Sequence, residues 1–515
     1  MKPKGMVFLV GAGPGDAGLL TLRGAELLAG ADVVVYDALV NSDLLKLAPA
    51  GAEIIFGGKR SGKSTMPQDE LNRLLISKAR AGKRVVRLKG GDPYVFGRGG
   101  EEAEQLADAG VEFEVVPGVS SFVAVPNYAG VPLTHREFCS KLTLITGHED
   151  PAKEASSINW EQVARTPGTK VIMMGTDRIG QIAETLTKHG LDKNTPVAMV
   201  QWGTTARQRA IEGTLENIAE VAAAAQIGPP TIAVIGDVVK LRPKLNWFEK
   251  RPLFGSRVVV TRPREQAGEL SRRLREAGAE VLEIPAIKIE PPTKREPLID
   301  AFLELNSYDW LVFTSPNGVT AFFEYFFRQF HDMRDLGGAR IAAVGPATAN
   351  KLKALHLQVD LMPEEALAAS IAEAFSDFES IENLKICLLR AEVANRELPE
   401  ALEALGAIVD DIAVYRTVAD TSDASAAGGK LLENGADWIV FSSGSTVEHF
   451  HARFDLPSLV KKFPKLRLAS IGPETTKVLV AHGLEPALEA TKHTSESLAD
   501  ELIAAAKSVP EPQLA

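Results

Sequence analysis

The sequence predicts an α/β protein built from several domains, and three observations lead to this prediction. The chain has 515 residues, about two to four times the usual size of one domain. Short runs rich in β-branched residues, such as 7–10 and 84–88, alternate with stretches of helical spacing, such as 68–81. The segment at 309–315 returns in similar form at 437–443. Alternating strands and helices indicate layered α/β domains, and the repeat indicates two related units in the second half.

The composition is that of a folded protein and argues against several other classes. With 45% hydrophobic and 24% charged residues the chain is near the globular average, which disfavours disorder and coiled coil. The apolar runs are far shorter than the roughly 20 residues of a membrane span, and residues 1–10 lack the pattern of a signal peptide. The net charge of −10 disfavours a nucleic-acid surface. We therefore expect a cytoplasmic protein that contacts neither membrane nor nucleic acid.

A basic stretch at 240–257 separates the two halves. It contains six Lys or Arg residues and one acid, Glu249, and it is interrupted by Pro243 and Pro252. Proline and clustered like charges are typical of a solvated linker, although a contact surface is the alternative. The main domain boundary is predicted here.

Three glycine-rich turns mark a candidate ligand site in the first half. They lie at 11–16, 90–100 and 117–121, and each follows a predicted strand. Glycine allows the backbone to approach a ligand closely, and the carboxyl ends of parallel strands are the usual position of an α/β site. A dinucleotide site is disfavoured, because Pro14 and Gly15 crowd the first turn.

The motifs of the two halves resemble two different families. The first half closely resembles uroporphyrinogen III C-methyltransferase over about residues 4–247, through the motifs at 11–16, 89–102, 116–121 and 128–136. The second half resembles uroporphyrinogen III synthase, through sparser motifs at 260–263, 313–318, 414–417 and 471–473. A synthase of this kind makes the substrate of the methyltransferase, so the two resemblances imply consecutive enzymes on one chain.

The resemblance implies a fold for each half. A two-lobed tetrapyrrole methylase fold is expected first, followed by a two-domain, internally duplicated α/β synthase fold. The expected divisions are 1–247 with lobes at about 1–137 and 138–247, then 248–515 with a domain one of 250–290 plus 419–515 and a domain two of 291–418.

By resemblance, the first half transfers two methyl groups from S-adenosylmethionine to uroporphyrinogen III, giving precorrin-2 and S-adenosylhomocysteine without a metal. Such a donor is expected to contact mainly backbone and small side chains. The alternative for Asp92 is a turn-forming role, which is common for Asp before Pro. The donor-binding residues that the resemblance implies are Pro14, Gly90, Gly91, Asp92, Val95, Ser120, Ser121, Met174 and Gly203.

For proton movement, the resemblance points to Asp37 as the acceptor and Lys59 as the donor. Both follow predicted strands, in turns that suit a cleft. The alternative is that Asp37 caps a loop and Lys59 is a surface charge that attracts the substrate. The carboxylates of the tetrapyrrole are expected to meet Lys59, Arg60 and Arg136.

The synthase family closes hydroxymethylbilane to uroporphyrinogen III with inversion of ring D. The substrate is intrinsically reactive, so the enzyme mainly has to hold one folded conformation. Tyr415 is the candidate for assisting loss of the hydroxyl, and a packing role is the alternative. Hydroxyls at turn positions of the repeats are expected to bind substrate carboxylates, with helix N-capping as the alternative. These residues are Ser315, Thr348, Ser442, Ser443 and Thr475.

The remaining expectations concern partners and rival functions. The cysteines and histidines suggest no metal site, because Cys139 and Cys387 are isolated and His449 and His451 point to different sides of a helix. A homodimer through the methyltransferase half is expected. The rival interpretations are a methylase for a later corrin intermediate and a second half that binds tetrapyrrole without catalysis.

Overall fold

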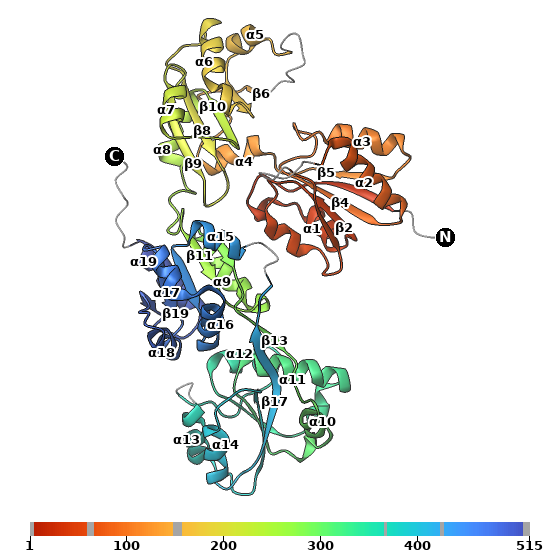
Figure 1. Cartoon of the computed structure of the whole chain (residues 1–515), viewed down its shortest axis with the longest axis vertical. Coiled ribbons are helices and arrows are strands. Elements are labelled where there is room, and N and C mark those ends of the chain that lie inside the picture. The colour runs from red at the N-terminus through yellow and green to blue at the C-terminus, as the bar shows by residue number, and fades with distance from the viewer. Residues whose placement is uncertain (1–4, 59–65, 148–156, 365–367, 423–426, 508–515) are drawn as a thin grey trace. The chain divides into compact units, whose positions relative to one another are not determined.

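The computed structural model describes residues 5–58, 66–147, 157–364, 368–422 and 427–507. Its contacts divide the chain into two units, of which the first is mostly Met1–Arg257 and the second mostly Val281–Ala505. Each unit contains two five-stranded sheets with helices packed on them (Figure 1).

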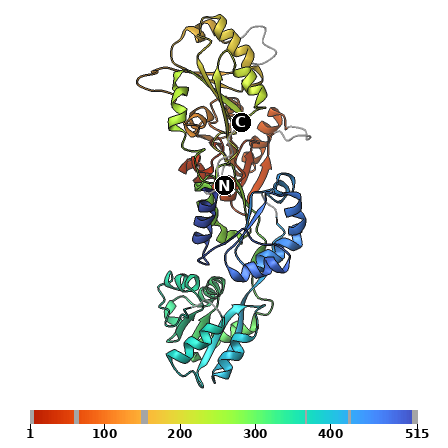
Figure 2. The same ribbon diagram turned by 90° about the vertical axis from the view of Figure 1, so that its left-hand side faces the viewer.

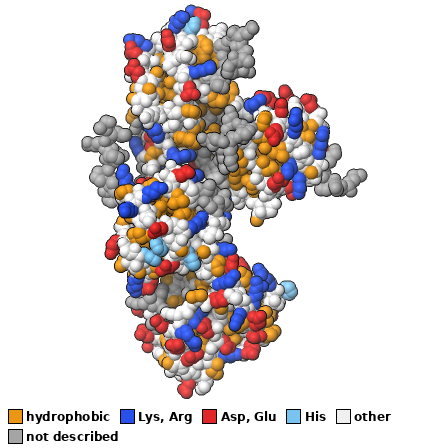
Figure 3. Space-filling model, in the orientation of Figure 1, with side chains coloured by type: hydrophobic (Ala, Val, Ile, Leu, Met, Phe, Trp, Pro, Cys, Tyr) orange, Lys and Arg blue, Asp and Glu red, His pale blue; other side chains and the backbone are white. Residues whose placement is uncertain are grey.

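The surface is charged and carries both signs. On the face drawn in Figure 3, Lys and Arg side chains lie among Asp and Glu side chains over both units. Within the described ranges, no helix combines the length and the apolar character needed to span a membrane.

The first sheet of the first unit is parallel throughout, with strand order β3-β2-β4-β1-β5. Helix α1 packs on one face, and α2 and α3 pack on the other. Because all strands run the same way, the turns after β1, β4 and β5 meet at one edge, as the sequence predicted. The elements are β1 (Met6–Gly11), α1 (Leu22–Ala29), β2 (Val33–Tyr36), β3 (Glu53–Phe56), α2 (Gln68–Arg80), β4 (Arg84–Lys89), α3 (Gly99–Asp108) and β5 (Phe113–Val116).

The second sheet of the first unit is mixed, with order β6-β7-β10-β8-β9. Helices α5, α6 and α7 cover one face, while α4 packs on the other through Val125, together with Ala129 just after the helix. Helix α4 follows the third glycine-rich turn directly, so it joins the two lobes at the predicted site. The elements are α4 (Ser121–Tyr128), β6 (Leu142–Thr146), α5 (Trp160–Arg165), β7 (Thr169–Met173), α6 (Ile179–Lys188), β8 (Pro196–Gln201), β9 (Arg209–Thr214), α7 (Ile218–Ala224) and β10 (Thr231–Ile235).

The basic stretch at 240–257 is part of the folded first unit, so its interpretation as a solvated linker was wrong. It contains helix α8 (Arg242–Leu245), and Phe248 is buried. The Glu249 carboxylate accepts hydrogen bonds from Arg242 Nη2 at 2.6 Å and from Gln208 Nε2 at 2.8 Å. The half-buried Glu249 carboxylate therefore pairs with Arg242 and anchors a stretch whose charge pattern suggested a solvated linker.

The first sheet of the second unit takes strands from both ends of that half, in the order β12-β11-β18-β19-β20. Helices α15, α16, α17 and α18 pack against it in one core. The elements are β11 (Arg257–Val260), α9 (Arg264–Glu276), β12 (Glu280–Glu283), α15 (Ala427–Asn434), β18 (Trp438–Phe441), α16 (Gly444–Phe454), α17 (Leu456–Lys462), β19 (Arg467–Ser470), α18 (Pro473–Ala481), β20 (Leu488–Glu489) and α19 (Ser495–Lys507).

The other sheet of the second unit is formed by the chain between these two ends, in the order β13-β17-β16-β14-β15. Helices α10, α11 and α12 cover one face, and α13 and α14 cover the other (Figure 2). The elements are β13 (Ile287–Glu290), α10 (Glu296–Leu303), β14 (Trp310–Phe313), α11 (Pro316–Gln329), β15 (Arg340–Ala343), α12 (Pro346–Lys353), α13 (Ala368–Phe378), β16 (Lys385–Ala391), α14 (Glu397–Ala404) and β17 (Ile408–Ala419).

The sequence repeat corresponds to equivalent elements of the two sheets. Strand β14 leads into α11 and strand β18 leads into α16, and a serine caps each helix. The Ser315 hydroxyl accepts from Gly318 N, and the Ser443 hydroxyl accepts from Thr446 N. The recurring Ser-Ser or Thr-Ser pair after each strand therefore marks a strand end followed by a helix start.

Candidate active sites

The three glycine-rich turns of the first unit touch one another. Strands β4, β1 and β5 are neighbours, and the first two turns are joined by a pair of hydrogen bonds between Gly13 and Gly91. In this pair, Gly91 N donates to Gly13 O at 2.8 Å and Gly13 N donates to Gly91 O at 3.3 Å. The third turn reaches the same place, because a Cβ atom on Gly118 would lie 2.3 Å from Gly91 O and 2.6 Å from Gly11 Cα. The turns thus form a cradle of backbone, in which Gly11 and Gly118 leave no room for a side chain between the first and third turns.

The Asp92 carboxylate links the second turn of this cradle to the third. One carboxylate oxygen accepts from Tyr94 N at 2.8 Å, within its own turn. The other accepts from Gly118 N at 3.0 Å, in the third turn. The contacts among described residues therefore support the turn-forming alternative for Asp92, and they place it where it holds Gly90 and Gly91 against the neighbouring turn.

The second lobe contributes a loop after β8 to the same region. Gly203 has no room for a side chain, because a Cβ atom there would lie 2.4 Å from the side chain of Val125 on α4. The hydroxyl of Thr204 accepts from Asp16 N at 3.2 Å, and Tyr128 OH donates to the Asp16 carboxylate at 2.8 Å. The structure therefore brings the Gly203 loop against the first turn, next to Pro14.

The other implied donor-binding residues lie around these turns. Ser120 and Ser121 begin α4, and a Cβ atom on Gly91 would lie 3.6 Å from Ser121 N. Val95 packs against the core that α4 shares with the second sheet. Met174 follows β7; the residue is 49% exposed and has a φ of 55°. Left-handed backbone is unfavourable for such a residue and is often found at functional sites.

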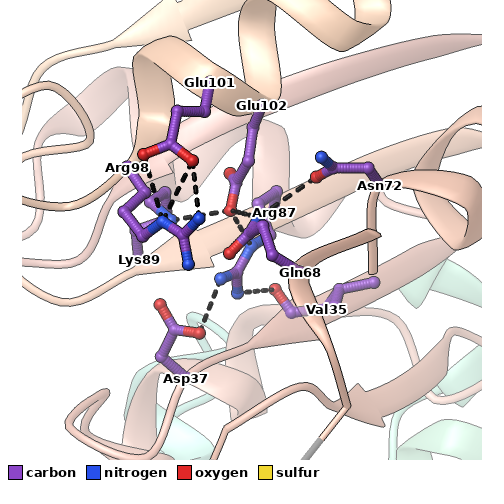
Figure 4. Close-up of polar contacts among 9 residues, drawn as sticks. All are labelled: Val35, Asp37, Gln68, Asn72, Arg87, Lys89, Arg98, Glu101 and Glu102. Carbon is purple, nitrogen blue, oxygen red and sulfur yellow. Dashed lines mark hydrogen bonds and ion pairs between the residues drawn. The ribbon is translucent and has the colours of Figure 1, made fainter. Parts of the chain in front are cut away.

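Asp37 lies at the end of β2 beside a buried charge network that sequence reasoning missed (Figure 4). Arg87 Nη2 donates to Asp37 Oδ1 at 2.6 Å, and Arg87 Nε donates to Glu102 Oε1 at 3.3 Å. Lys89 Nζ also donates to Glu102 Oε1, at 2.8 Å, as does Gln68 Nε2 at 3.1 Å. The side chains of Arg87 and Lys89 are 4% exposed, that of Glu102 is 0% exposed, and that of Asp37 is 30% exposed. Asp37 is thus the most exposed charge of this network.

The network has two positive and two negative side chains. Burial lowers the pKa of Lys89, and the charge of Arg87 lowers it further, while Glu102 acts in the opposite direction. Glu102 Oε2 is buried and has no hydrogen-bond partner among the described residues. A sequence signal existed, since Arg87 and Lys89 alternate with Val86 and Leu88 in a central strand and must point to one side of it.

Of the cations predicted to bind substrate in the first half, the structure describes Arg136 only. Lys59 and Arg60 fall outside the described residues. Arg136 is exposed, in the turn closed by the bridge between His135 and Cys139.

In the second unit, Tyr415 lies on β17 with its hydroxyl 3.0 Å from Ser315 Oγ. Its side chain belongs to the core beneath α11. Burial raises the pKa of the Tyr415 phenol, and hydrogen bonds with Ser315 and Asn317 act in the opposite direction. The phenol is therefore kept protonated beside the start of α11, where it can donate a hydrogen bond.

The other hydroxyls of the second unit differ in their surroundings. Ser315 and Ser443 cap helices, as the alternative interpretation held. Thr348 and Thr475 are buried in the first turns of α12 and α18, and Ser442 is half-buried before α16. Among the described residues, no cluster of three or more His, Cys, Asp or Glu side chains is arranged to hold a metal ion.

Comparison with known proteins gives a family for each half and for the whole. Residues 6–219 match the family model of tetrapyrrole (corrin/porphyrin) methylases, and residues 268–500 match that of uroporphyrinogen-III synthase HemD. The porphyrin biosynthesis protein HemD of Ruminiclostridium josui is 39% identical over 97% of this chain and 98% of its own length. The chain belongs to this HemD family. The resemblance seen in the sequence motifs is thereby confirmed, and the chain carries a uroporphyrinogen III C-methyltransferase domain and a uroporphyrinogen III synthase domain.

Two further relatives match the methyltransferase domain of this HemD-family chain. The S-adenosyl-L-methionine-dependent uroporphyrinogen III methyltransferase of Methanosarcina barkeri is 55% identical over 46% of this chain and 93% of its own length. A crystal structure of uroporphyrin-III C-methyl transferase from Thermus thermophilus, complexed with S-adenyl homocysteine, is 42% identical. It covers 46% of this chain and 99% of its own, with a TM-score of 0.40. The family model and the Methanosarcina barkeri relative place the first half in a family of S-adenosylmethionine-dependent methyltransferases.

Proposed function

We propose that the chain catalyses two consecutive reactions of tetrapyrrole biosynthesis. The second half cyclises hydroxymethylbilane to uroporphyrinogen III with inversion of ring D. The first half then methylates uroporphyrinogen III twice, giving precorrin-2. The observation that carries the proposal is the 39% identity to a HemD protein across both halves, together with the site geometry of each unit.

The backbone cradle of the first unit suits a nucleoside-type donor. S-adenosylmethionine supplies an activated methyl group, and the protein has to align it with the acceptor carbon and to remove a proton. The residues proposed to hold the donor are Pro14, Gly90, Gly91, Val95, Ser120, Ser121, Met174 and Gly203, with Asp92 as the residue that shapes their turns. The fit is supported by the close backbone contacts of Gly11 and Gly118, which hold the first and third turns together with no side chain between them.

Asp37 is proposed as the proton acceptor. Its carboxylate is partly exposed. It lies beside the cradle, because β2 neighbours β4 and Asp37 N donates to Leu88 O at 3.4 Å. Lys59 is proposed as the proton donor. Lys59, Arg60 and Arg136 are proposed to meet the carboxylates of uroporphyrinogen III.

In the second unit, Tyr415 is proposed to assist loss of the substrate hydroxyl by donating a hydrogen bond. Its pKa, raised by burial, keeps the proton on the phenol. Ser315, Thr348, Ser442, Ser443 and Thr475 are proposed to bind substrate carboxylates through hydroxyls and the amides around them, a role that for Ser315 and Ser443 coexists with capping.

The test supplies hydroxymethylbilane to the full chain with and without S-adenosylmethionine. Type III uroporphyrinogen is expected without the donor, and its dimethylated product with it. Formation of the symmetrical type I isomer alone would contradict the synthase activity and would favour a second half that binds tetrapyrrole without catalysis. Methylation of uroporphyrinogen III supplied directly tests the first half independently, and failure there would favour a later corrin substrate.

A homodimer through the methyltransferase half is also proposed, on the resemblance alone. Light scattering of the full chain tests it, since a monomer has a mass of 55.3 kDa. A mass that stays at the monomer value across the concentration range would contradict the dimer.

A further inference from the structure

We propose that Arg87 is a positioning residue for methyl transfer, which fixes the orientation of the Asp37 carboxylate. The proposal rests on the proposed function of Asp37 as proton acceptor. It goes beyond that function by assigning a role to a buried side chain on the neighbouring strand.

The contacts of Arg87 define one orientation of Asp37. Arg87 Nη2 lies 2.6 Å from Asp37 Oδ1, and Arg87 Nη1 lies 3.5 Å from Val35 O on the strand that carries Asp37. The guanidinium therefore contacts both the carboxylate and the strand leading to it. Among the described residues, none donates a hydrogen bond to Asp37 Oδ2, so Arg87 engages only one oxygen of this partly exposed carboxylate.

Arg87 is itself held from the opposite side. Its Nε donates to Glu102 Oε1, which lies in the first turn of α3 and also accepts from Lys89 and Gln68. Burial of an unpaired guanidinium costs free energy of folding. Here the guanidinium is paired with two carboxylates, through Nε with Glu102 and through Nη2 with Asp37. The guanidinium cannot rotate towards Glu102 or Asp37 without losing the other, so its position is fixed by two elements, α3 and β2.

This arrangement connects Asp37, the proposed proton acceptor, to the backbone cradle proposed to bind S-adenosylmethionine. Arg87 precedes the turn of Gly90 and Gly91 by three residues on the same strand. A Cβ atom on Gly90 would lie 3.4 Å from Leu39 Cβ, so the chain just after Asp37 packs on that turn. A shift of about 1 Å in a catalytic group can cost about 100-fold in rate, so an anchor at this point affects turnover more than binding.

The rival interpretation is that Arg87 only neutralises Glu102 in a buried core. A double-mutant cycle separates the two, because a residue that acts through Asp37 loses its effect when Asp37 is already impaired. The variants are Arg87→Gln, Asp37→Asn, the double variant and Arg87→Lys, which keeps the charge but not the fork. Arg84→Gln is the matched control, since Arg84 begins the same strand and its Nε donates to Gly30 O, away from Asp37.

Methylation of supplied uroporphyrinogen III is measured under single-turnover and steady-state conditions, with binding of S-adenosylhomocysteine by calorimetry. Turnover by the wild-type chain establishes the proposed function before any variant is compared, so failure of that function is recognised separately. For Arg87→Gln we expect kcat to fall about 10- to 100-fold, while KM and the affinity for S-adenosylhomocysteine stay within about threefold. Arg87→Lys should recover part of the loss, and Arg84→Gln should change little.

In the Asp37→Asn background, adding Arg87→Gln should lower the rate less than about threefold further. Three results would overturn the proposal. The first is a double variant whose rate loss equals the product of the losses of the two single variants. The second is an Arg87→Gln variant whose affinity for S-adenosylhomocysteine falls by the same factor as its kcat. The third is full turnover by Asp37→Asn.

Discussion

Replacing Gly11 by alanine is expected to open the backbone cradle and to slow methyl transfer. A Cβ atom at this position would lie 2.5 Å from both the Cα and the N of Gly118 and 2.7 Å from Gly91 O. Non-bonded carbon atoms prefer about 3.5–4.0 Å, so the first and third turns would have to separate by about 1 Å. The opposing atoms are backbone, which cannot rotate away as a side chain would.

The magnitude follows from that displacement. A misplacement of about 1 Å corresponds to about a 100-fold loss in kcat/KM, and overpacking of this kind costs about 1–3 kcal/mol of folding free energy. The assays are methylation of uroporphyrinogen III, calorimetry with S-adenosylhomocysteine, and thermal melting. Synthase activity of the same sample shows that the second half is folded.

Gly100→Ala is the matched control, because a Cβ atom there meets nothing within 4 Å and the residue lies in α3. This control should keep full activity and gain up to about 1 kcal/mol of stability, since alanine favours a helix over glycine. Wild-type turnover and wild-type affinity in Gly11→Ala would refute the reasoning from close backbone approach.

Four further outcomes are expected. Asp92→Ala removes the acceptor for Tyr94 N and Gly118 N, so affinity for S-adenosylhomocysteine should fall by about 1–3 kcal/mol in calorimetry, and an unchanged affinity would argue against a shaping role. Tyr415→Phe should slow type III isomer formation about ten- to thousand-fold and leave methylation intact, whereas unimpaired turnover would assign the ring to packing. Burial raises the pKa of Tyr415 above the usual value of about 10, so the phenol keeps its proton below that pH and proton loss should not slow the synthase there. The contradicting result is a synthase rate that declines between about pH 8 and 9.5 in the wild type and no longer does so in Tyr415→Phe. Burial raises the pKa of Cys387 to about 12, so this thiol should resist a disulfide reagent at about pH 8 until the chain unfolds, and reaction in the native state would count against its burial.

The glycine-rich turns could be placed from the sequence because local signals define them. A run of β-branched residues that ends in Gly, Pro or Asp marks a strand end, and parallel strands bring such ends to one edge. Gly11, Gly91 and Gly118 accordingly meet, although which glycine excludes which neighbour required the structure.

The charge network beside Asp37 could not be predicted in the same way. Arg87 and Lys89 are separated from Glu102 by the turn and the start of α3, and the burial of a long basic side chain depends on that tertiary partner. The basic stretch at 240–257 was misread for a related reason. Its charge pattern is local, whereas Gln208, which helps to hold Glu249, comes from the distant β8–β9 loop.

The split first sheet of the second unit has a consequence for synthesis on the ribosome. Strands β13 to β17 are contiguous in the chain, so their domain can fold as soon as β17 has emerged. Strand β11 has to wait for β18, about 150 residues after β12, which corresponds to about 8–30 s at usual translation rates. During that interval the edge of β11 lacks its native neighbour, so the nascent chain passes through a stage that favours chaperone binding or mispairing.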